Sequence, residues 1–273
     1  MILLALIVAS FATWLSLRPG GHTVGRPTPL SVPAARPPAI APVELLNVTP
    51  ERARAINAAV PFVKGPHVPS LEVRFTSNGP DFDRARDCLA AAAWYEAGDD
   101  LAGARSVAQV VLNRLMHPAF PKTVCGVVFE GEARATGCQF TFTCDGALAR
   151  RRPSKTAWLK AQAVAERALT GAVDSSVGLA THYHTDWVIP IWSSSLEKIA
   201  QVGSHLFFRF PGYWGRRAAL RRPPPMPEPM IAKLSFLSSA HVGRDGGDFV
   251  MPKPDDEDIL ALVDRLQKFG PNR

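Results

Sequence analysis

The sequence predicts an α+β domain that is mainly α, because long helical patterns and a few short β-like segments fill the middle of the chain. Apolar residues recur at helical spacing over residues 83–97, 102–117 and 154–170. The stretch 179–192 is β-like and rich in aromatic residues and histidine, and 206–210 reads as a closing strand. Helices therefore form most of the predicted core, with a small β region.

The first helix ends in a carboxylate with unusual neighbours. The alanine run Ala90–Ala93 leads into Trp94, Tyr95 and Glu96, and Gly98 follows. A Glu that closes a helix between aromatic residues and a glycine is poorly hydrated, and poor hydration raises the pKa of a carboxylic acid. Glu96 is therefore a candidate general acid.

The second and third helices have recognisable ends. Pro118 ends the second helix, and Asn113 and Arg114 just before it are expected to satisfy free carbonyls and complement the helix dipole. Ser154 caps the third helix and Gly171 terminates it.

Two further segments complete this middle part of the chain. Ser194 and Glu197 form a capping-box pattern that predicts a short helix to about residue 202. Residues 123–129 fit either a short helix or a strand.

Composition divides the chain into four parts. Residues 1–18 are apolar and predict a signal anchor or signal peptide. Residues 19–81 form a Pro/Ala-rich linker with a short helix that starts at Thr49-Pro50. The core domain is expected over 82–212. Residues 213–273 are expected to be a basic, Pro-rich linker and a C-terminal amphipathic helix.

Charge and motifs limit the possible partners. The 273 residues carry a net charge of +7, which fits attraction to an anionic surface such as a bacterial envelope. The sequence has no aromatic-interleaved basic patch, zinc-finger spacing or Gly-rich phosphate loop, so nucleic acid is not an expected partner. No cofactor is expected.

The four cysteines fit an exported chain, because an oxidising compartment lets them pair. Three connectivities are possible, and we expect Cys88–Cys125 and Cys138–Cys144, the second closing a small β-hairpin. A zinc site is the rival interpretation. It is less favoured because the chain has no C-x-x-C pair.

Several stretches together resemble the bacterial cell wall hydrolase family of the spore-cortex-lytic (SleB) type. They occur in the family's order, and the likeness covers about residues 85–210. They are Trp94–Gly98, Val107–Arg114, Phe120–Val128, Gln139–Phe140 and Ile199–Phe207.

The resemblance implies a lysozyme-like, lytic-transglycosylase-like catalytic domain that cleaves peptidoglycan glycan strands. It implies that Glu96 is the general acid and that 82–212 is the catalytic domain. The implied location is the periplasmic cell envelope, anchored to the inner membrane by residues 1–18, with protein partners unknown. The family's Glu-Ala-Arg-Gly-Glu is here Glu-Ala-Gly-Asp-Asp, which leaves the roles of Asp99 and Asp100 open.

Two glycosidic mechanisms fit these residues. In the favoured one, Glu96 protonates the leaving oxygen and then, ionised, removes the proton of the sugar's 6-hydroxyl, which closes an anhydro ring. The alternative is a muramidase that uses a second carboxylate. Asp99 and Asp100 are more simply helix caps, and Glu130 and Glu132 are expected to be exposed.

Five residues are candidates for substrate binding. Gln139 suits an N-acetyl group, and the aromatic rings suit sugar faces, although core packing is an alternative for each ring. The candidates are Gln139, Phe140, Tyr183, Trp192 and His182.

Two other function classes stay open. His182 and His184 share a strand face, and with Asp186 they suggest a zinc-dependent amidase, although no diagnostic third ligand is visible. A non-catalytic, envelope-anchored peptidoglycan binder is the third possibility.

Overall fold

The computed structural model describes residues 37–39, 44–65, 68–75, 78–134 and 137–241, all within one unit, Ala35–Arg273. The predicted anchor, residues 1–18, and the predicted C-terminal amphipathic helix lie outside these ranges. Within them, no helix combines the length and the apolar character needed to cross a membrane.

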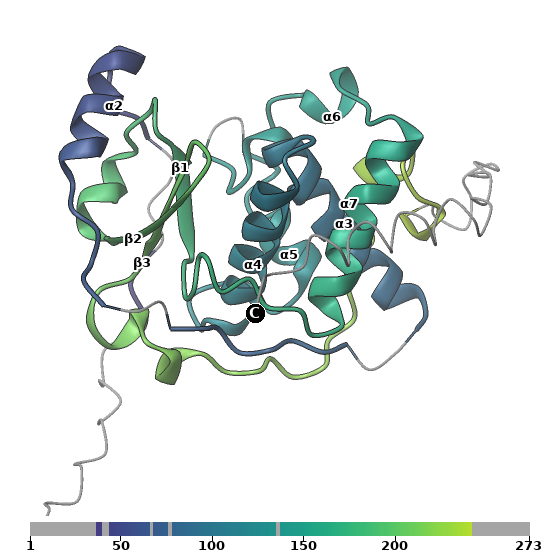
Figure 1. The fold of residues 1–273 in the computed structure, drawn as a ribbon. Coiled ribbons are helices and arrows are strands. Elements are labelled where there is room, and N and C mark those ends of the chain that lie inside the picture. The colour runs from purple at the N-terminus through teal and green to yellow at the C-terminus, as the bar shows by residue number, and fades with distance from the viewer. Residues whose placement is uncertain (1–36, 40–43, 66–67, 76–77, 135–136, 242–273) are drawn as a thin grey trace, which may run out of the picture. The chain divides into compact units, whose positions relative to one another are not determined.

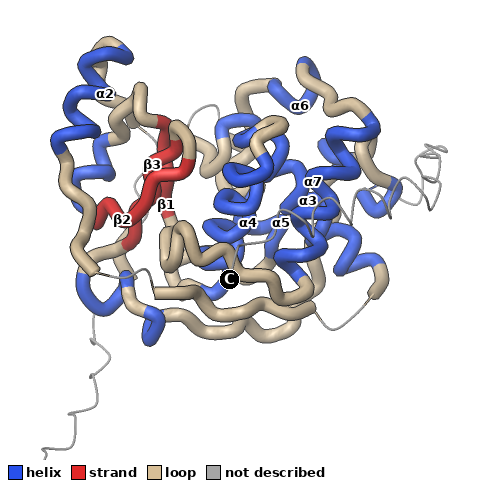
Figure 2. The backbone as a smooth tube through the Cα atoms, in the orientation of Figure 1, coloured by secondary structure: helices blue, strands red, loops and turns tan. Residues whose placement is uncertain are grey.

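The three long helices predicted for the middle of the chain and the short helix at Thr49-Pro50 are confirmed, and α5 settles the ambiguous stretch 123–129 as a helix (Figures 1 and 2). The α-helices are α2 (Pro50–Ala59), α3 (Pro80–Ala97), α4 (Leu101–Met116), α5 (Val124–Val128), α6 (Ala147–Arg150) and α7 (Lys155–Leu169). Short 3-10 turns occupy Thr141–Thr143, Ile191–Ser195, Gly212–Gly215, Arg217–Ala219, Ala232–Leu234 and Ser239–His241.

Local chemistry sets where the helices begin. The side chain of Thr49 accepts a hydrogen bond from the Arg52 backbone N–H at 3.3 Å, and Ser154 does the same for Ala157 at 3.2 Å. Helix α3 begins at Pro80, earlier than the expected residue 83, because proline at the first helical position brings a suitable φ and no orphan N–H.

The three strands form one antiparallel sheet in the order β1–β3–β2. They are β1 (His182–Thr185), β2 (Glu197–Val202) and β3 (His205–Arg209). In Figure 1 the sheet lies between α2 and the helical group that contains α3, α4, α5 and α7. Tyr183 of β1 and Phe207 of β3 pack with Val110 of α4, so one face of the sheet covers this helix.

Two expected elements were wrong. Residues 197–202 form strand β2 and not a helix, because pairing with β3 buries Lys198, Ile199 and Ala200 and outweighs the local capping pattern. The expected hairpin between Cys138 and Cys144 is absent from the described chain, where this stretch contains a 3-10 turn.

The core is centred on α3. The four alanines Ala90–Ala93 are fully buried, and their small side chains let α4, α5 and α7 approach this helix closely. The α+β, mainly α fold with a small β region is therefore confirmed.

Both expected disulfides are present. Cys88 of α3 is bonded to Cys125 of α5, and Cys138 is bonded to Cys144. The first joins two helices inside the core, where both half-cystines are fully buried. The second closes a short loop beside Phe140.

The linker expected from residue 213 was wrong for its first part. The arginines at 216, 217, 221 and 222 are exposed, but apolar residues between and after the prolines are buried in the main core. These buried residues turn the segment into a strap over α3 and α5. They are Leu220, Ile231, Leu234 and Leu237.

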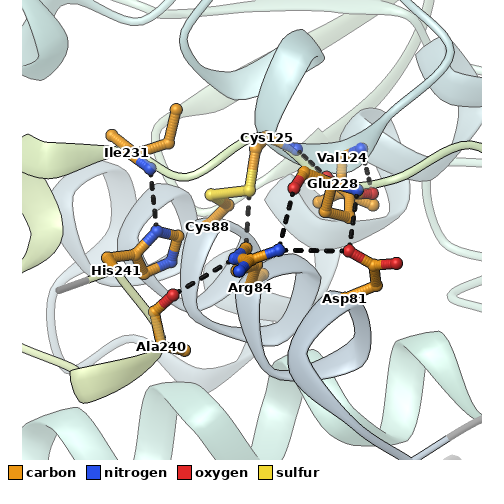
Figure 3. A network of polar contacts seen from close by, with 9 residues as sticks. All are labelled: Asp81, Arg84, Cys88, Val124, Cys125, Glu228, Ile231, Ala240 and His241. Atoms are coloured by element: carbon orange, nitrogen blue, oxygen red, sulfur yellow. Dashed lines mark hydrogen bonds and ion pairs between the residues drawn. A yellow bond between two sulfur atoms is a disulfide. The ribbon is translucent and has the colours of Figure 1, made fainter. Parts of the chain in front are cut away.

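A buried carboxylate fixes this strap to α5 (Figure 3). The Glu228 side chain accepts hydrogen bonds from the backbone N–H groups of Val124 at 2.7 Å and Cys125 at 2.9 Å. The backbone N–H of Glu228 donates to Asp81 at 3.1 Å. The orphan amides at the start of α5 are thus satisfied by a residue about a hundred positions away.

Replacing Glu228 by alanine should lower the free energy of unfolding by roughly 2–4 kcal/mol, because two buried amide donors lose charged acceptors. Chemical denaturation measures this loss. The matched control is Glu166→Ala, which removes an exposed carboxylate on α7. Equal stability of the two variants would contradict the structural role of Glu228.

Candidate active site

Glu96 lies in the last turn of α3, one residue before the helix ends. The side chain is half-buried. Burial raises the pKa of Glu96 to about 7; a hydrogen bond from Tyr183 and the charge of Arg114 oppose this shift, and the charge of Asp145 adds to it. The carboxyl is therefore partly protonated near neutral pH and able to donate a proton.

Arg114 is the buried cation of the site. It comes from the last turn of α4, is almost fully buried, and donates from Nε to the backbone oxygen of Thr181. Its guanidinium lies over the rings of Phe120 at 5.3 Å and Phe140 at 5.4 Å. Burial lowers the pKa of Arg114 to about 10, so it stays charged and favours ionised Glu96.

Tyr183 approaches Glu96 from the sheet. It lies on the face of β1 that packs against α4, and its hydroxyl is close enough to the Glu96 carboxyl to lower the pKa of that carboxyl by hydrogen bonding. Burial and the neighbouring Glu96 charge raise the pKa of Tyr183 well above its usual value. It therefore stays a neutral donor that orients the carboxyl.

Gln139 and Phe140 lie beside Arg114. The Gln139 amide is assigned the orientation in which its oxygen faces the guanidinium of Arg114. This oxygen accepts hydrogen bonds from both terminal nitrogens of Arg114 at 3.1 Å. Among the described residues, no hydrogen bond of the Gln139 amide nitrogen is then found. Phe140 is buried, with 2% exposed, so its ring packs under Arg114 and Tyr183 and presents no face to a sugar.

His182 and Trp192 are not brought to Glu96. Successive strand residues face opposite sides, so His182 points away from the side of Tyr183. It is buried against Trp192 at 5.1 Å and Phe210 at 5.1 Å between ring centroids. His184 packs on the same face against Phe208 at 5.0 Å. These residues form an aromatic cluster behind the sheet.

The aspartates near the site have structural roles or lie exposed. Asp100 caps α4 by accepting from the Ala102 N–H at 3.0 Å, which confirms its expected capping role, and Asp99 is exposed. Asp145 is exposed and accepts from the Ala147 N–H at 2.6 Å at the start of α6.

Glu130 and Glu132 differ from expectation because both are half-buried. One carboxylate oxygen of Glu130 is buried without a partner among the described residues. Burial raises the pKa of Glu130, and the Arg114 charge lowers it.

The described residues do not assemble a ligand set around His182 and His184. The Nδ1 atoms of these histidines bond Thr181 and the Thr185 carbonyl, and Asp186 pairs with Arg54 of α2 at 3.3 Å. One group within the described ranges has metal-ligand spacing, Cys88, Cys125 and His241, and its two sulfur atoms are bonded to each other.

Arg114 and Glu130 were missed as site residues. The sequence signal for Arg114 is an arginine that follows the apolar run Val110–Leu112 near the end of α4, since a buried arginine must find charged or polar partners. Glu130 carries no comparable signal, because its burial comes from the fold of the loop that returns to Gln139. Its backbone oxygen accepts from the Gln139 N–H at 3.0 Å.

Comparison with known proteins shows what this part of the chain resembles. A family model described as Cell Wall Hydrolase matches residues 98–208. This segment is therefore similar to the cell wall hydrolase family. It contains Arg114, Gln139 and Tyr183, and it begins two residues after Glu96.

Curated proteins to which this segment is similar are named spore cortex-lytic enzyme. The one from Halalkalibacterium halodurans is 37% identical over 120 residues, which cover 44% of this chain and 33% of the relative. The one from Bacillus subtilis is 34% identical over 120 residues, which cover 44% of this chain and 35% of the relative. The chain thus spans about a third of the length of these relatives.

Two solved structures also match the domain, each over 50% of this chain. The catalytic domain of the Bacillus cereus SleB protein is 27% identical, with a TM-score of 0.37 and 95% of that chain covered. The catalytic domain of the germination-specific lytic transglycosylase SleB from Bacillus anthracis is 29% identical, with a TM-score of 0.36 and 100% covered.

Proposed function

We propose that this protein cleaves the glycan strand of peptidoglycan, with Glu96 acting first as general acid and then as general base. The observation that carries the proposal is the environment of Glu96, whose pKa burial raises to about 7 beside Arg114 and Tyr183. The cell wall hydrolase match and the relatives named spore cortex-lytic enzyme support a cell wall substrate.

In the first step, protonated Glu96 donates its proton to the glycosidic oxygen as the bond to the sugar breaks. The sugar takes on oxocarbenium character, and the carboxyl becomes a carboxylate. Arg114 and the Tyr183 hydroxyl stabilise this new negative charge, since both favour the ionised form of Glu96. Their stabilisation grows as the charge develops, which is the condition for lowering a barrier.

In the second step, the Glu96 carboxylate removes the proton of the sugar's own 6-hydroxyl, whose oxygen then closes an anhydro ring. Glu96 ends the cycle protonated. Gln139 suits substrate positioning, because its oxygen is held by Arg114 while its amide N–H group remains free to donate to an N-acetyl carbonyl.

A muramidase is the second candidate, and the position of two carboxylates favours it. Asp145 is close enough to raise the pKa of Glu96, and Glu130 lies near Arg114. Either could hold a water molecule in place of the 6-hydroxyl. Asp145 already caps α6, so Glu130 is the better candidate for that role.

Product analysis separates these reactions. Purified peptidoglycan sacculi are digested with the full chain, and mass spectrometry reads the muramic acid ends. The proposed function predicts anhydro ends, which Glu130→Gln and Asp145→Asn still produce. Reducing ends that disappear in Glu130→Gln would establish a muramidase, and free peptide stems with intact glycan would establish an amidase.

Replacing Tyr183 by phenylalanine should move the pH dependence of cleavage. The acid step needs protonated Glu96, so activity falls as pH rises past about 7. Tyr183 lowers the pKa of Glu96, so its loss should shift this fall to higher pH. Rates of glycan release across pH 5–9 measure the shift, and Tyr213→Phe is the matched control. If the activity of Tyr183→Phe fell at the same pH as that of the wild type, the proposed effect of Tyr183 on Glu96 would be contradicted.

We also propose that the protein works in the cell envelope, outside the cytoplasm, anchored by residues 1–18. The substrate class and the two disulfides support this location. Fractionation of cells that express the full chain, compared with a chain lacking residues 1–18, tests the anchor.

A further inference from the structure

A cavity lies on the side of α4 away from Arg114. Nine residues separate Arg105 from Arg114, about 2.5 helical turns, so the two arginines project from opposite sides of the helix. The cavity has a volume of about 350 Å³, within the range of small-ligand pockets. It does not include Glu96.

The walls of this cavity come from three places. Helix α4 contributes Leu101, Ala102, Arg105 and Gln109, helix α7 contributes Val164, Arg167 and Ala168, and the loop 172–176 and Val202 complete it. Most of these side chains are small and apolar, and no aromatic ring lines the cavity. A sugar site normally offers flat rings, so a saccharide is a poor occupant.

The polar groups of the wall form a fixed loop. The Asp174 carboxylate accepts from Ser106 Oγ at 2.9 Å, the Ser176 N–H at 3.0 Å and Ser176 Oγ at 2.6 Å. The Asp174 backbone N–H donates to Gln109 Oε1 at 2.8 Å. These bonds hold the loop in place and occupy three of the roughly four acceptor sites of the Asp174 carboxylate.

The two arginines on the rim have no such partners. Within the described part of the chain, the guanidinium groups of Arg105 and Arg167 make no ion pair and no hydrogen bond. The two guanidinium groups outnumber the single carboxylate, that of Asp174, so the rim of the cavity carries a net positive charge. The rest of the lining is mostly apolar. A guanidinium fork is suited to a carboxylate, with which it forms two parallel hydrogen bonds.

We propose that this cavity binds a short peptide with small apolar side chains and free carboxylates. The peptide stem of peptidoglycan, which combines alanine with carboxylate-bearing residues, is the natural occupant; this identification rests on the proposed function. A stem held on one side of α4 would position its glycan strand relative to Glu96, which lies in the last turn of the preceding helix α3. The exposed hydroxyl of Ser175 adds a hydrogen-bonding group that a peptide uses and a fatty acid does not.

Calorimetry on the full wild-type chain with the synthetic peptide L-Ala-γ-D-Glu-L-Lys-D-Ala tests the proposal, since this probe contains no glycosidic bond. We expect saturable binding that weakens with salt. The double variant Arg105→Ala/Arg167→Ala should weaken it at least about tenfold, the loss expected for a pair of charge-assisted contacts. The control Arg52→Ala/Arg222→Ala removes the same charge from exposed positions and should bind like the wild type.

A second variant tests the cavity without changing charge. Ala172 is an exposed part of the wall, so Ala172→Trp should fill the cavity and abolish peptide binding while the protein stays folded. The proposal is overturned if the wild type shows no saturable binding at millimolar peptide, or if both variants bind normally. Equal binding of decanoate or inorganic phosphate at this site would also overturn it, in favour of a general carboxylate or anion site.

The glycan and peptide proposals fail separately. Glu96→Gln should bind the peptide normally while it releases no glycan. Arg105→Ala/Arg167→Ala should still cleave glycan stripped of its peptides and lose activity on intact sacculi. Peptide binding without any glycan cleavage by the wild type would refute the proposed function and leave an acidic-peptide site.

Discussion

Replacing Glu96 by glutamine should reduce release of soluble glycan from purified peptidoglycan by about 10³-fold or more, because the glutamine amide has no acidic proton to transfer to the leaving oxygen. The same change should stabilise the folded protein above neutral pH. The free energy of unfolding therefore distinguishes a chemical defect from a folding defect. Both quantities are measured on the same preparation, by turbidity of sacculi and by chemical denaturation at several pH values.

The sign of the stability change follows from the raised pKa. Burial raises the pKa of Glu96 from 4.5 to about 7 in the folded state, so between these values the folded protein holds a proton that the unfolded chain releases. Wild-type stability therefore decreases as pH rises from 4.5 to 7 and then stays lower. Glutamine does not ionise, so above pH 7 the variant should gain roughly 2 kcal/mol, allowing for partial solvation of the carboxyl.

Glu166→Gln provides the matched control, because it makes the same change from carboxyl to amide at an exposed position on α7. It should keep full activity. If Glu96→Gln cleaved peptidoglycan as fast as this control, Glu96 would not be the proton donor. If its stability advantage did not grow with pH, the carboxyl would be hydrated in the folded protein.

Removing the Cys88–Cys125 disulfide should lower the free energy of unfolding by about 4 kcal/mol, because it closes a loop with a sequence separation of 37. Both half-cystines are fully buried between α3 and α5, so alanine at both positions also leaves unfilled space. Chemical denaturation of Cys88→Ala/Cys125→Ala against wild type measures the loss. This helix pair carries Glu96, so activity should fall at the temperature where the variant unfolds.

The second disulfide serves as the internal comparison. Cys138–Cys144 has a sequence separation of only 6, so Cys138→Ala/Cys144→Ala should cost about 2 kcal/mol. A larger loss from the shorter loop would mean that the second disulfide holds the Gln139–Phe140 loop in ways beyond chain entropy.

The helical part of the fold could be predicted because its signals are local. Apolar periodicity, the caps at Thr49 and Ser154 and the proline stops act within one or two turns, and α3, α4 and α7 form where these signals predict. Strand β2 could not be predicted in this way. Its Ser194–Glu197 pattern is a helix start by itself, and only the partner strand β3 and the buried Lys198, which donates to Asn57 and Val60, decide otherwise.

The strap shows the same limit at longer range. Prolines and arginines between residues 216 and 227 are typical of a solvated linker, yet Glu228 finds two amides of α5 far away in sequence. Nothing local to Glu228 indicates those donors. The burial of such an acid can be predicted only when it is known that backbone N–H groups at the start of α5 need an acceptor.

The sequence indicates the candidate site only as far as the chemistry of its residues depends on their neighbours in sequence. Glu96 has its aromatic and glycine neighbours beside it in sequence, so its environment was visible. Tyr183 and Gln139 entered as candidates through aromatic character and family resemblance. Arg114 did not, because its site role depends on Gln139 and Thr181 meeting it across the fold.

A carbon-13 NMR titration of the Glu96 side-chain carboxyl, assigned by its absence in Glu96→Gln, tests the central claim most directly. The structure predicts a midpoint at about pH 7, which moves upward in Tyr183→Phe. A midpoint near 4.5, the value of a solvated glutamate, would contradict the claim that this carboxyl keeps a proton at neutral pH.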